Sequence, residues 1–506
     1  MKMLLLSVNY NLNDLNIGLN SIHSALLVKG HQSHFLTIPS RQKSGGITPG
    51  LIRFIERIEP DLIGCSLHTN EFDPIKTFSS VMKGKFPDIP IIWGGVHPTM
   101  HPESCFPYTD YVCIGEGEQT ILEIAKCVDN REDFRKTRNL CYKKDGKLIK
   151  NPLYQAIENL DDFPFPEFLP ANTYVYYRGK IQALDKTRYA NFARYGGRVL
   201  HALSSRGCPF ECSYCCNSFY LKLYGKKLRT RTVENLIRGI QEQIRKHKEI
   251  KWIFFYDENF LAHDSTYIRK FCDLYREKIS KPFTIMSTPI YISKERIQML
   301  KDAGLMFVQS GLQTGSDRIA KDVFKRKSLR KDFIRAMHIL KDDNIPTSVD
   351  VILDNPFENE SDTIRTILTL AKVPKPFNGI FFSLTFFHGT EICHMAESAR
   401  MNAIRNPVEK NSLECEKNVL NEMAKLAVYL DEVQVERMIR QYLRAKDKKR
   451  FTLYLLKMKV LSYAIYQPYW DLCLLYNASG ANLLKMLINF RFLLSEWFRR
   501  RFIWNL

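Results

Sequence analysis

Apolar and polar residues alternate along the first 130 positions in a way that predicts strands and helices in turn. Short apolar runs typical of buried strands lie at 3–8, 34–38, 61–66, 89–93 and 111–114. Helix-like stretches lie at 18–29, 51–58, 72–85 and 118–128. Because parallel strands need a long crossover between them, this alternation predicts an α/β fold with a doubly wound parallel sheet.

The loops after these strands form the expected ligand-binding edge, because open parallel sheets bind ligands at the carboxyl ends of their strands. They comprise residues 66–73, 94–101 and 115–118. Gly94 and Gly95 would let the backbone approach a ligand closely, or they would only make a tight turn. No G-x-G-x-x-G follows the first strand, so the dinucleotide fingerprint is missing.

A second series of strand-like runs fills the middle of the chain. The runs lie at 200–205, 252–256, 283–287, 307–310, 348–353 and 380–384. Helix-like stretches separate them, which makes six βα units. Six such units predict a partial (β/α)6 barrel related to the TIM barrel, in which catalytic groups lie at the C-terminal ends of the strands.

The segments between and after the two series complete the predicted organisation. Residues 141–154 indicate a hairpin that turns at Asp145-Gly146, and 159–168 indicates an extended, proline-containing linker. After about residue 400 the pattern turns helical. We therefore expect four units, at 1–135, 136–195, 196–400 and 401–506.

Cysteine usage points to metal chemistry rather than to disulfides. Thirteen cysteines in 506 residues are too dilute for a disulfide scaffold, yet four of them fall within 208–216. The first residues form a short apolar run that does not resemble a signal peptide. A reducing, cytoplasmic location is therefore expected. Overall, 45% hydrophobic and 25% charged residues make wholesale disorder unexpected.

Three of the clustered cysteines have the spacing C-x3-C-x2-C. Thiolates at Cys208, Cys212 and Cys215 can hold three irons of a 4Fe-4S cluster, and the fourth iron then keeps open positions for a ligand. Zinc is the alternative, but it usually pairs C-x2-C with a distant second pair, which we do not find. Cys216 adjoins Cys215 and is expected to pack against its surroundings.

This loop resembles the radical S-adenosylmethionine (SAM) superfamily, since Tyr214 precedes the last cysteine of the C-x3-C-x-aromatic-C pattern. The resemblance implies that the open iron binds the amino and carboxyl groups of SAM. It also implies that one electron, from a reductant such as a flavodoxin or ferredoxin, cleaves SAM to a 5′-deoxyadenosyl radical. The cofactors carry the chemistry, and the protein positions them.

Three later segments resemble the SAM-binding strand ends of that family. WIFFYDENF ends in acidic and amide side chains that could hold the SAM ammonium group, Asp257, Glu258 and Asn259. FVQSGLQTGSD places Gln313 where the family usually has Glu, with Ser316 after it, near the expected ribose. SVDVILDNPFENESD places Asp354 at the turn that in the family contains two glycines, both absent here.

The front of the chain resembles the cobalamin-binding domain of one subgroup of this superfamily, on the segments GCSLHTNEFD, WGGVHPTMHPE and IGEGE. The resemblance implies a Rossmann-like sheet with cobalamin facing the barrel mouth, near Ser66, Gly94, Gly95, His97 and Gly115. No D-x-H-x-x-G occurs in residues 1–60. Cobalamin would therefore lack that lower histidine ligand, or the domain has lost the cofactor.

The subgroup implies an enzyme that uses SAM and cobalamin to transfer a methyl group to an unactivated carbon of a small-molecule or lipid-like substrate. One alternative is a radical SAM oxidoreductase or cyclase whose front domain is only a scaffold or lid. Another is a non-catalytic iron-sulfur or zinc protein that docks on membrane or RNA. A tRNA methylthiotransferase would need three further clustered cysteines in the front domain, which are absent.

The last residues are basic and rich in bulky apolar side chains. Residues 441–506 contain 12 Lys/Arg against 3 Asp/Glu, and the whole chain has a net charge of +20. This composition suits either an interfacial helix, with peripheral contact at the inner membrane face, or a helical cap on the barrel with solvated Lys/Arg. Uncharged stretches are too short to span a membrane, and no RNA-binding fold follows residue 400, so nucleic acid is not expected.

Overall fold

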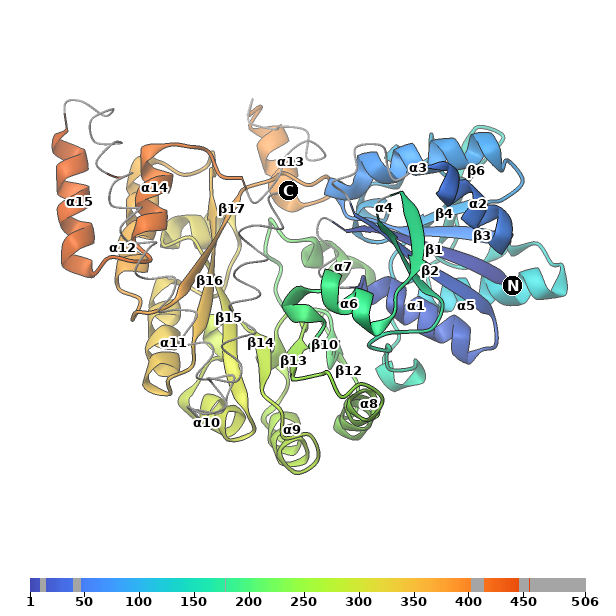
Figure 1. Cartoon of the computed structure of the whole chain (residues 1–506). Helices are drawn as coiled ribbons and strands as arrows, with labels where there is room; N and C mark the ends of the chain where they lie inside the picture. The colour runs from blue at the N-terminus through green and yellow to red at the C-terminus, as the bar shows by residue number, and fades with distance from the viewer. Residues whose placement is uncertain (10–14, 40–46, 178, 402–413, 446–454, 456–506) are drawn as a thin grey trace.

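The computed structural model describes residues 1–9, 15–39, 47–177, 179–401, 414–445 and 455. It contains two large sheets, each flanked by helices, and a helical C-terminal segment (Figure 1). The blue front sheet and the green-to-orange second sheet lie side by side. Both predicted fold classes are confirmed.

The front sheet has nine strands in the order β7-β6-β5-β4-β3-β1-β2-β8-β9. Its five central strands run parallel, as predicted. Their bounds are β1 (Lys2–Asn9), β2 (Gln32–Pro39), β3 (Leu62–Ser66), β4 (Ile91–Gly94) and β5 (Tyr111–Cys113). The chain order reverses between β1 and β3, which is the position where such sheets bind ligands.

Helices cover both faces of this sheet, so it is doubly wound. One apolar core joins the sheet to α2 (Pro49–Ile58) and α3 (Phe72–Lys85), and a second core joins it to α1 (Ile17–Val28) and α5 (Glu118–Asn130). The short helix α4 (Val96–Met100) follows β4. Parallel sheets are stable only when both faces are covered in this way.

Two hairpins extend the front sheet beyond its predicted limits. The hairpin β6 (Leu140–Lys144) and β7 (Lys147–Lys150) adds to β5, and β8 (Thr173–Tyr177) with β9 (Lys180–Ala183) adds to β2. The sequence pattern predicts only the first of them as a hairpin, within a connecting segment at 136–195, and does not predict the second. Their strand pairing instead makes them edge strands of the front sheet, because backbone groups at a sheet edge need partners.

The second sheet has six parallel strands in sequential order, as predicted for a partial barrel. They are β10 (Val199–Ala202), β13 (Trp252–Phe255), β14 (Phe283–Met286), β15 (Leu305–Gln313), β16 (Thr347–Leu353) and β17 (Asn378–Ser383). The predicted first strand is shorter than expected. Its last residue, Ser205, belongs instead to β11 (Ser205–Arg206), which pairs with β12 (Arg229–Thr230) in a separate ladder.

Helices pack against the second sheet and share one continuous apolar core with it. They include α6 (Lys186–Phe192), α8 (Val233–Lys246), α9 (Ser265–Lys278), α10 (Lys294–Asp302), α11 (Arg330–Asp342) and α12 (Glu360–Ala371). Two other helices, α7 (Cys216–Tyr224) and α13 (Glu391–Ser398), contribute no described residue to that core, and the buried residues of α13 join a separate apolar cluster with Phe324. Alternate strand residues face this core, such as Val349 and Val351 on β16, and Asp350 between them faces the opposite side.

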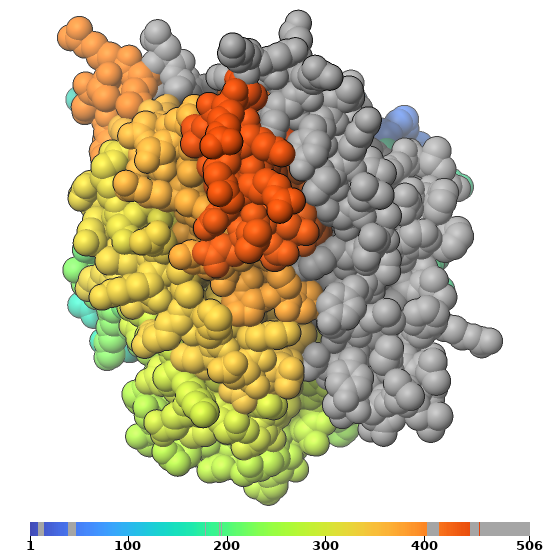
Figure 2. Space-filling model, turned by 90° about the vertical axis from the view of Figure 1, so that its left-hand side faces the viewer, coloured from blue at the N-terminus to red at the C-terminus, as the bar shows by residue number. Residues whose placement is uncertain are grey.

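Two C-terminal helices, α14 (Val419–Leu426) and α15 (Glu432–Arg444), pack on α12. Figure 2 shows α15 on the surface beside the helices of the barrel. Met423 and Met438 belong to the barrel core. The basic stretch 441–506, for which the sequence suits either a helical cap or an interfacial helix, lies almost entirely outside the described residues. Within the described ranges, no helix combines the length and hydropathy needed for a membrane span.

Candidate functional site

The cysteine loop lies between β11 and α7, at the carboxyl end of β10, where the βα pattern predicts it. Gly207 adopts φ 97°, a conformation that favours glycine, and turns the chain into the loop. Ser213 fixes the middle of the loop, because its amide donates to Phe324 O at 3.1 Å and its hydroxyl donates to Val323 O at 2.6 Å. The loop is therefore held from the far side of the barrel.

Cys208, Cys212 and Cys215 lie near one another, since each thiol is within the electrostatic influence of at least one of the others. Burial raises the pKa of Cys208 to about 12 and also raises that of Cys212. A metal would therefore displace protons from these thiols on binding.

The choice between a cluster and a single ion rests on the sequence spacing of these cysteines. Among the described residues, His388, Cys393 and Glu397 are the one group of three potential ligands with all their ligand atoms within 4.8 Å of one another. The C-x3-C-x2-C spacing without a distant second pair of cysteines favours an iron-sulfur cluster over zinc in the loop.

A buried arginine stands beside the loop. Arg326 donates from Nη1 to the Tyr214 hydroxyl at 2.7 Å and from Nη2 to Gly311 O at 2.8 Å. The Tyr214 ring packs edge-on against Phe324. Burial disfavours the charged guanidinium, but its interactions with Tyr214 and Cys212 outweigh this and raise the pKa of Arg326. The loop thus has a permanent cation next to Cys212.

Asp257, at the end of β13, holds the start of the cysteine loop. Its fully buried carboxylate accepts hydrogen bonds from the Ser204 and Ser205 hydroxyls, both at 2.5 Å, and from the Ser204 amide at 3.2 Å. Burial raises the pKa of Asp257, although these hydrogen bonds oppose the shift. His263 Nε2 lies 2.8 Å from the Ser204 hydroxyl. The Asp257 carboxylate therefore already accepts three hydrogen bonds from the protein.

Its two neighbours differ in exposure. Glu258 is exposed and accepts a hydrogen bond from Asn217 Nδ2 at 3.0 Å. The surrounding protein, and then the charge of Asp257, raise the pKa of Glu258. Asn259 is fully buried; its Oδ1 accepts from the Ser287 hydroxyl at 2.9 Å and the Thr288 amide at 3.2 Å.

The other residues predicted to bind SAM, Gln313, Ser316 and Asp354, lie at the same strand edge. The side chains of Ser316 and Asp354 form hydrogen bonds with other protein side chains. The Ser316 hydroxyl donates to Asp362 Oδ1 at 2.6 Å. Asp354, at the end of β16, accepts from the Ser383 hydroxyl and the Asn421 amide side chain, both at 2.5 Å. Gln313 adopts φ 64° and folds over Gly311, where a β-carbon would lie 2.4 Å from Gln313 Nε2.

Three buried nitrogen donors at this edge have no hydrogen-bond partner among the described residues. They are Asn259 Nδ2 after β13, Arg326 Nε after β15 and Asn355 Nδ2 after β16. Unsatisfied buried donors are rare in proteins, and each needs an explanation such as a missing ligand. Donors are what the carboxylate, hydroxyl and ring-nitrogen acceptors of SAM require. The residues present therefore fit that molecule.

The front-sheet residues predicted to line cobalamin lie together at the carboxyl edge of β3, β4 and β5. Gly95 adopts φ 96°, and a β-carbon there would lie 2.8 Å from Ser66 Oγ. Gly94 has no such close neighbour. Gly115 adopts φ 80° and packs against Tyr224 of α7. Neighbouring protein atoms therefore fill the space beside Gly95 and Gly115, where a ligand could otherwise approach the backbone.

The described histidines at this edge all have protein partners. His97 Nδ1 and Nε2 lie 3.1 Å from Thr69 Oγ1 and 3.0 Å from Ser104 Oγ, and burial lowers the pKa of His97 to about 4. His68 pairs with Glu71 at 3.4 Å. Both ring nitrogens of His97 therefore already lie within hydrogen-bond distance of protein hydroxyls, and its contact with cobalamin stays a prediction.

Buried ion pairs join the two edges. Glu116 accepts from Arg229 at 2.6 and 2.9 Å and lies 3.5 Å from Arg206, and Arg206 also donates to Glu118 at 2.5 Å. Burial alone would raise the pKa of Glu118, but Arg206 outweighs this and lowers it. The Tyr224 hydroxyl accepts from the Glu116 amide at 2.7 Å. The GEGE loop is thereby fixed to the residues that flank the cysteine loop.

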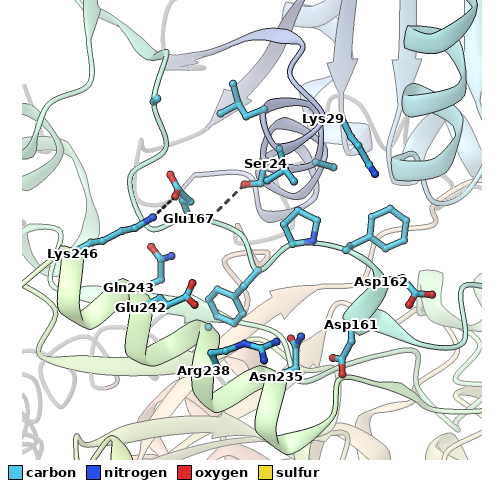
Figure 3. Close-up of a pocket in the computed structure, with 18 of the residues that line it drawn as sticks. Ser24, Lys29, Asp161, Asp162, Glu167, Asn235, Arg238, Glu242, Gln243 and Lys246 are labelled. Atoms are coloured by element: carbon cyan, nitrogen blue, oxygen red, sulfur yellow. Dashed lines mark hydrogen bonds and ion pairs between the residues drawn. The ribbon is translucent and has the colours of Figure 1, made fainter.

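A cavity of about 720 Å³ opens elsewhere on the same junction (Figure 3). It lies between α1, the segment 161–171 and α8, and Lys246 pairs with Glu167 at its wall. None of its lining residues belongs to the cysteine loop or to the strand edges described above. It is therefore separate from the candidate cofactor site.

Comparison with known families agrees with this geometry. The Radical SAM superfamily matches residues 203–370, and the B12 binding domain matches residues 2–125. The chain carries a radical SAM domain. A B12-binding domain precedes it, and the two matches coincide with the two sheets.

Two curated relatives are similar to parts of this radical SAM protein. An uncharacterized methyltransferase of Pyrococcus horikoshii is 26% identical over 280 residues, covering 54% of this chain and 56% of the relative. An anaerobic magnesium-protoporphyrin IX monomethyl ester cyclase of Rubrivivax gelatinosus is 26% identical over 339 residues, covering 64% and 56%. The chain thus spans little more than half the length of these relatives.

A solved structure supports the fold of the whole radical SAM chain. The cobalamin-dependent S-adenosylmethionine radical enzyme OxsB, with aqua-cobalamin and S-adenosylmethionine bound, has a TM-score of 0.64 and 15% identity. The match covers 99% of this chain and 75% of that one. At this identity the likeness establishes the fold alone.

Sequence reasoning missed the arginines of the site. Arg206 directly precedes the Gly207-Cys208 turn, and its charge next to a cluster motif was an available signal. Arg326 lies in the basic run FKRKS between Lys325 and Lys327, and the sequence does not show that the arginine is the buried one of these three cations. Asn355 was named only as part of a turn. None of these pairings is local, so spacing alone does not reveal them.

Proposed function

We propose that this chain is a cobalamin-dependent radical SAM methyltransferase acting on an unactivated carbon of a small-molecule or lipid-like substrate. The observation that carries the proposal is the junction itself. The cysteine loop at one sheet edge and the cobalamin-type edge of the other sheet are held together by the buried contacts of Glu116, Arg206 and Arg229. Two cofactors that act on one substrate need such a fixed separation.

Cys208, Cys212 and Cys215 would hold three irons of a 4Fe-4S cluster, and the remaining iron would be free for SAM. Cobalamin would lie along the edge formed by Ser66, Gly94 and the Gly115 loop. When bound, these groups supply the reductive cleavage of SAM and the carriage of a methyl group. A low-potential protein such as a flavodoxin or ferredoxin would supply the electron.

The chain's own residues divide into two sets around SAM. Asn259 Nδ2, Arg326 Nε and Asn355 Nδ2 are the unsatisfied donors that would bind its acceptor atoms, and the exposed Glu258 carboxylate would bind its ammonium group. The second set holds the binding loops in place through protein contacts. It comprises Tyr214, Asp257, Gln313, Ser316 and Asp354.

The test is anaerobic reconstitution with iron, sulfide, cobalamin, SAM and reductant. We expect about four irons per chain, 5′-deoxyadenosine as a product and a corrinoid absorbance that survives gel filtration. Changing Cys208, Cys212 or Cys215 to Ala should abolish both iron binding and SAM cleavage, whereas Cys216→Ala should keep them. An intact cluster that yields no 5′-deoxyadenosine would overturn the proposal.

A second candidate, an anaerobic oxidative cyclase, is favoured by the relative from Rubrivivax gelatinosus. Methyl-labelled SAM distinguishes the two functions once a substrate is in hand. A methyltransferase moves the label into the product, and a cyclase leaves it on methionine. Extracts of a deletion strain that lack a methylated compound would supply that substrate.

A further inference from the structure

A mixed group of potential metal ligands lies where the barrel meets the front sheet. It consists of His388, in the turn after β17, and Cys393 and Glu397 on α13. Their ligand atoms all lie within 4.8 Å of one another, and within the described part of the chain this is the one group of three for which that holds. The cysteine loop contributes none of these residues.

Local structure explains why these three side chains meet. Cys393 and Glu397 are four residues apart on α13, so they lie on one face of the helix. The hydroxyl of the N-cap residue Thr390 donates to Phe387 O at 2.6 Å and closes the turn that carries His388. The backbone thus brings His388 back to the first turns of the helix.

The donor set selects the kind of ion. Imidazole nitrogen, thiolate sulfur and carboxylate oxygen together suit zinc and similar divalent first-row ions, whereas Mg²⁺ and Ca²⁺ take oxygen ligands almost alone. Cys393 is 1% exposed, and its thiol donates to Glu397 Oε1 at 3.5 Å. An ion between these two groups would replace the thiol proton in that contact.

The surroundings place this group at the junction of three segments. The His101 ring, after α4 of the front half, lies 4.7 Å from the His388 ring. A β-carbon at Gly389 would lie 3.2 Å from Met100 O. On the other side, the Ile392 amide donates to Ser213 O in the cysteine loop at 3.0 Å.

We propose that His388, Cys393 and Glu397 bind one divalent transition-metal ion, zinc by their chemistry, at a site separate from the cysteine loop. Three protein ligands leave one position of a tetrahedral ion for water. The ion fixes α13 to the turn before it. Because that turn contacts α4 and α13 contacts the cysteine loop, the ion stabilises the junction of the two halves.

The test compares the full chain, reconstituted with its cluster, with the full chain in which Cys208, Cys212 and Cys215 are all changed to Ala. After chelation and reloading with Zn²⁺, both should hold about one zinc per chain by elemental analysis. Loading with Co²⁺ instead should give a thiolate-to-cobalt absorbance in the near ultraviolet. Both readouts are independent of catalysis.

Variants made in the triple-Ala background identify the ligands. Cys393→Ala should remove the cobalt–thiolate band, and His388→Ala should weaken Zn²⁺ binding by about tenfold or more. Glu397→Gln, at an exposed position, should do the same without disturbing the fold. The matched control is Cys272→Ala, which removes another buried cysteine, on α9, and should leave metal binding unchanged.

The proposal fails if the triple-Ala chain holds no zinc, or if Cys393→Ala leaves the cobalt–thiolate band intact. It also fails if Glu397→Gln binds Zn²⁺ as tightly as its parent. Metal binding that raises the unfolding midpoint of the parent, but not of the His388→Ala variant, supports the structural role of the ion.

Discussion

The charge of Glu116 should be worth more to stability than that of any exposed carboxylate on the chain. Its side chain is 16% exposed and pairs with Arg229, which is 5% exposed, through two hydrogen bonds. Glu116→Gln keeps the shape and one acceptor oxygen but removes the charge. Arg229 then remains buried with only Ile157 O and the Tyr224 ring as further recorded contacts.

The magnitude follows from this burial. Removing one partner of a buried ion pair costs about 3–5 kcal/mol, because it leaves an uncompensated buried charge. The retained amide oxygen and the partial exposure reduce the expected cost to roughly 2–3 kcal/mol. For a chain of this length that unfolds as one unit, the unfolding midpoint should fall by about 2–3 °C.

The assay is thermal and urea unfolding of the full chain. The matched control is Glu103→Gln, which removes the same charge from a pair with Lys150 at 2.8 Å, with both side chains more than half exposed. Exposed pairs contribute about 0–1 kcal/mol, so this variant should unfold almost like the parent. A double-mutant cycle of Glu116→Gln with Arg229→Met should give a coupling energy of about 2 kcal/mol.

The reasoning is refuted if Glu116→Gln and Glu103→Gln lower stability equally, or if the cycle gives no coupling. Either result would mean that the junction does not depend on buried charge. A loss of corrinoid retention in Glu116→Gln, with the cluster intact, would connect the ion pair to the proposed function.

Two further predictions test the site, and a third tests Lys375, a lysine of the barrel that donates to Leu370 O and Ala427 O. Asp257→Asn removes the carboxylate charge that accepts hydrogen bonds from the two serine hydroxyls, so iron retention and 5′-deoxyadenosine formation should each fall about tenfold. The control Asp264→Asn, at the N-cap of α9, should change neither quantity. Arg326→Met removes the cation beside the cysteine loop, and the cluster's reduction potential should fall by tens of millivolts in a spectroscopic titration, whereas Lys321→Met, at an exposed position, should not shift it. Burial lowers the pKa of Lys375 from 10.5 to about 7, so between about pH 7 and pH 10.5 the unfolded chain binds more protons than the folded chain. This group therefore makes the free energy of unfolding rise with pH across that window, by at most about 1.4 kcal/mol per pH unit. Lys375→Met should flatten this rise when urea unfolding is measured at several pH values.

Local pattern was sufficient to predict the central parallel strands of the front sheet and the strands of the second sheet. The helix predicted at 72–85 matches α3, and the six barrel strands appear in the predicted order. What the pattern could not supply was long-range pairing. Phe35 of β2 lies beside Thr173 of β8, and nothing in either segment specifies the other. The pattern therefore predicts the first hairpin without its place at the edge of the front sheet, and it does not predict the second hairpin.

The candidate site shows the same division between local and non-local information. The cysteine spacing is contained in eight residues, so the cluster loop could be predicted from the sequence together with the downstream strand-end segments. The contact between Arg326 and Tyr214 joins residues 112 positions apart, and the contact between Arg206 and Glu118 joins residues 88 apart. Charge compensation inside a folded protein depends on which elements meet, so the sequence shows the charges without showing their partners.

The structure shows two different hydrogen-bonding states within the segment that follows β13. Asp257 and Asn259 occur in one short segment, and both were predicted to contact SAM. Asp257 Oδ1 accepts from two serine hydroxyls, whereas Asn259 Nδ2 has no partner within the described residues. A satisfied acceptor is stable, so Asp257 is suited to hold the loop. An unsatisfied buried donor is costly, so Asn259 is suited to bind a ligand. A motif can therefore contain both the support of a site and its contact surface, and hydrogen-bond satisfaction is the property that distinguishes them.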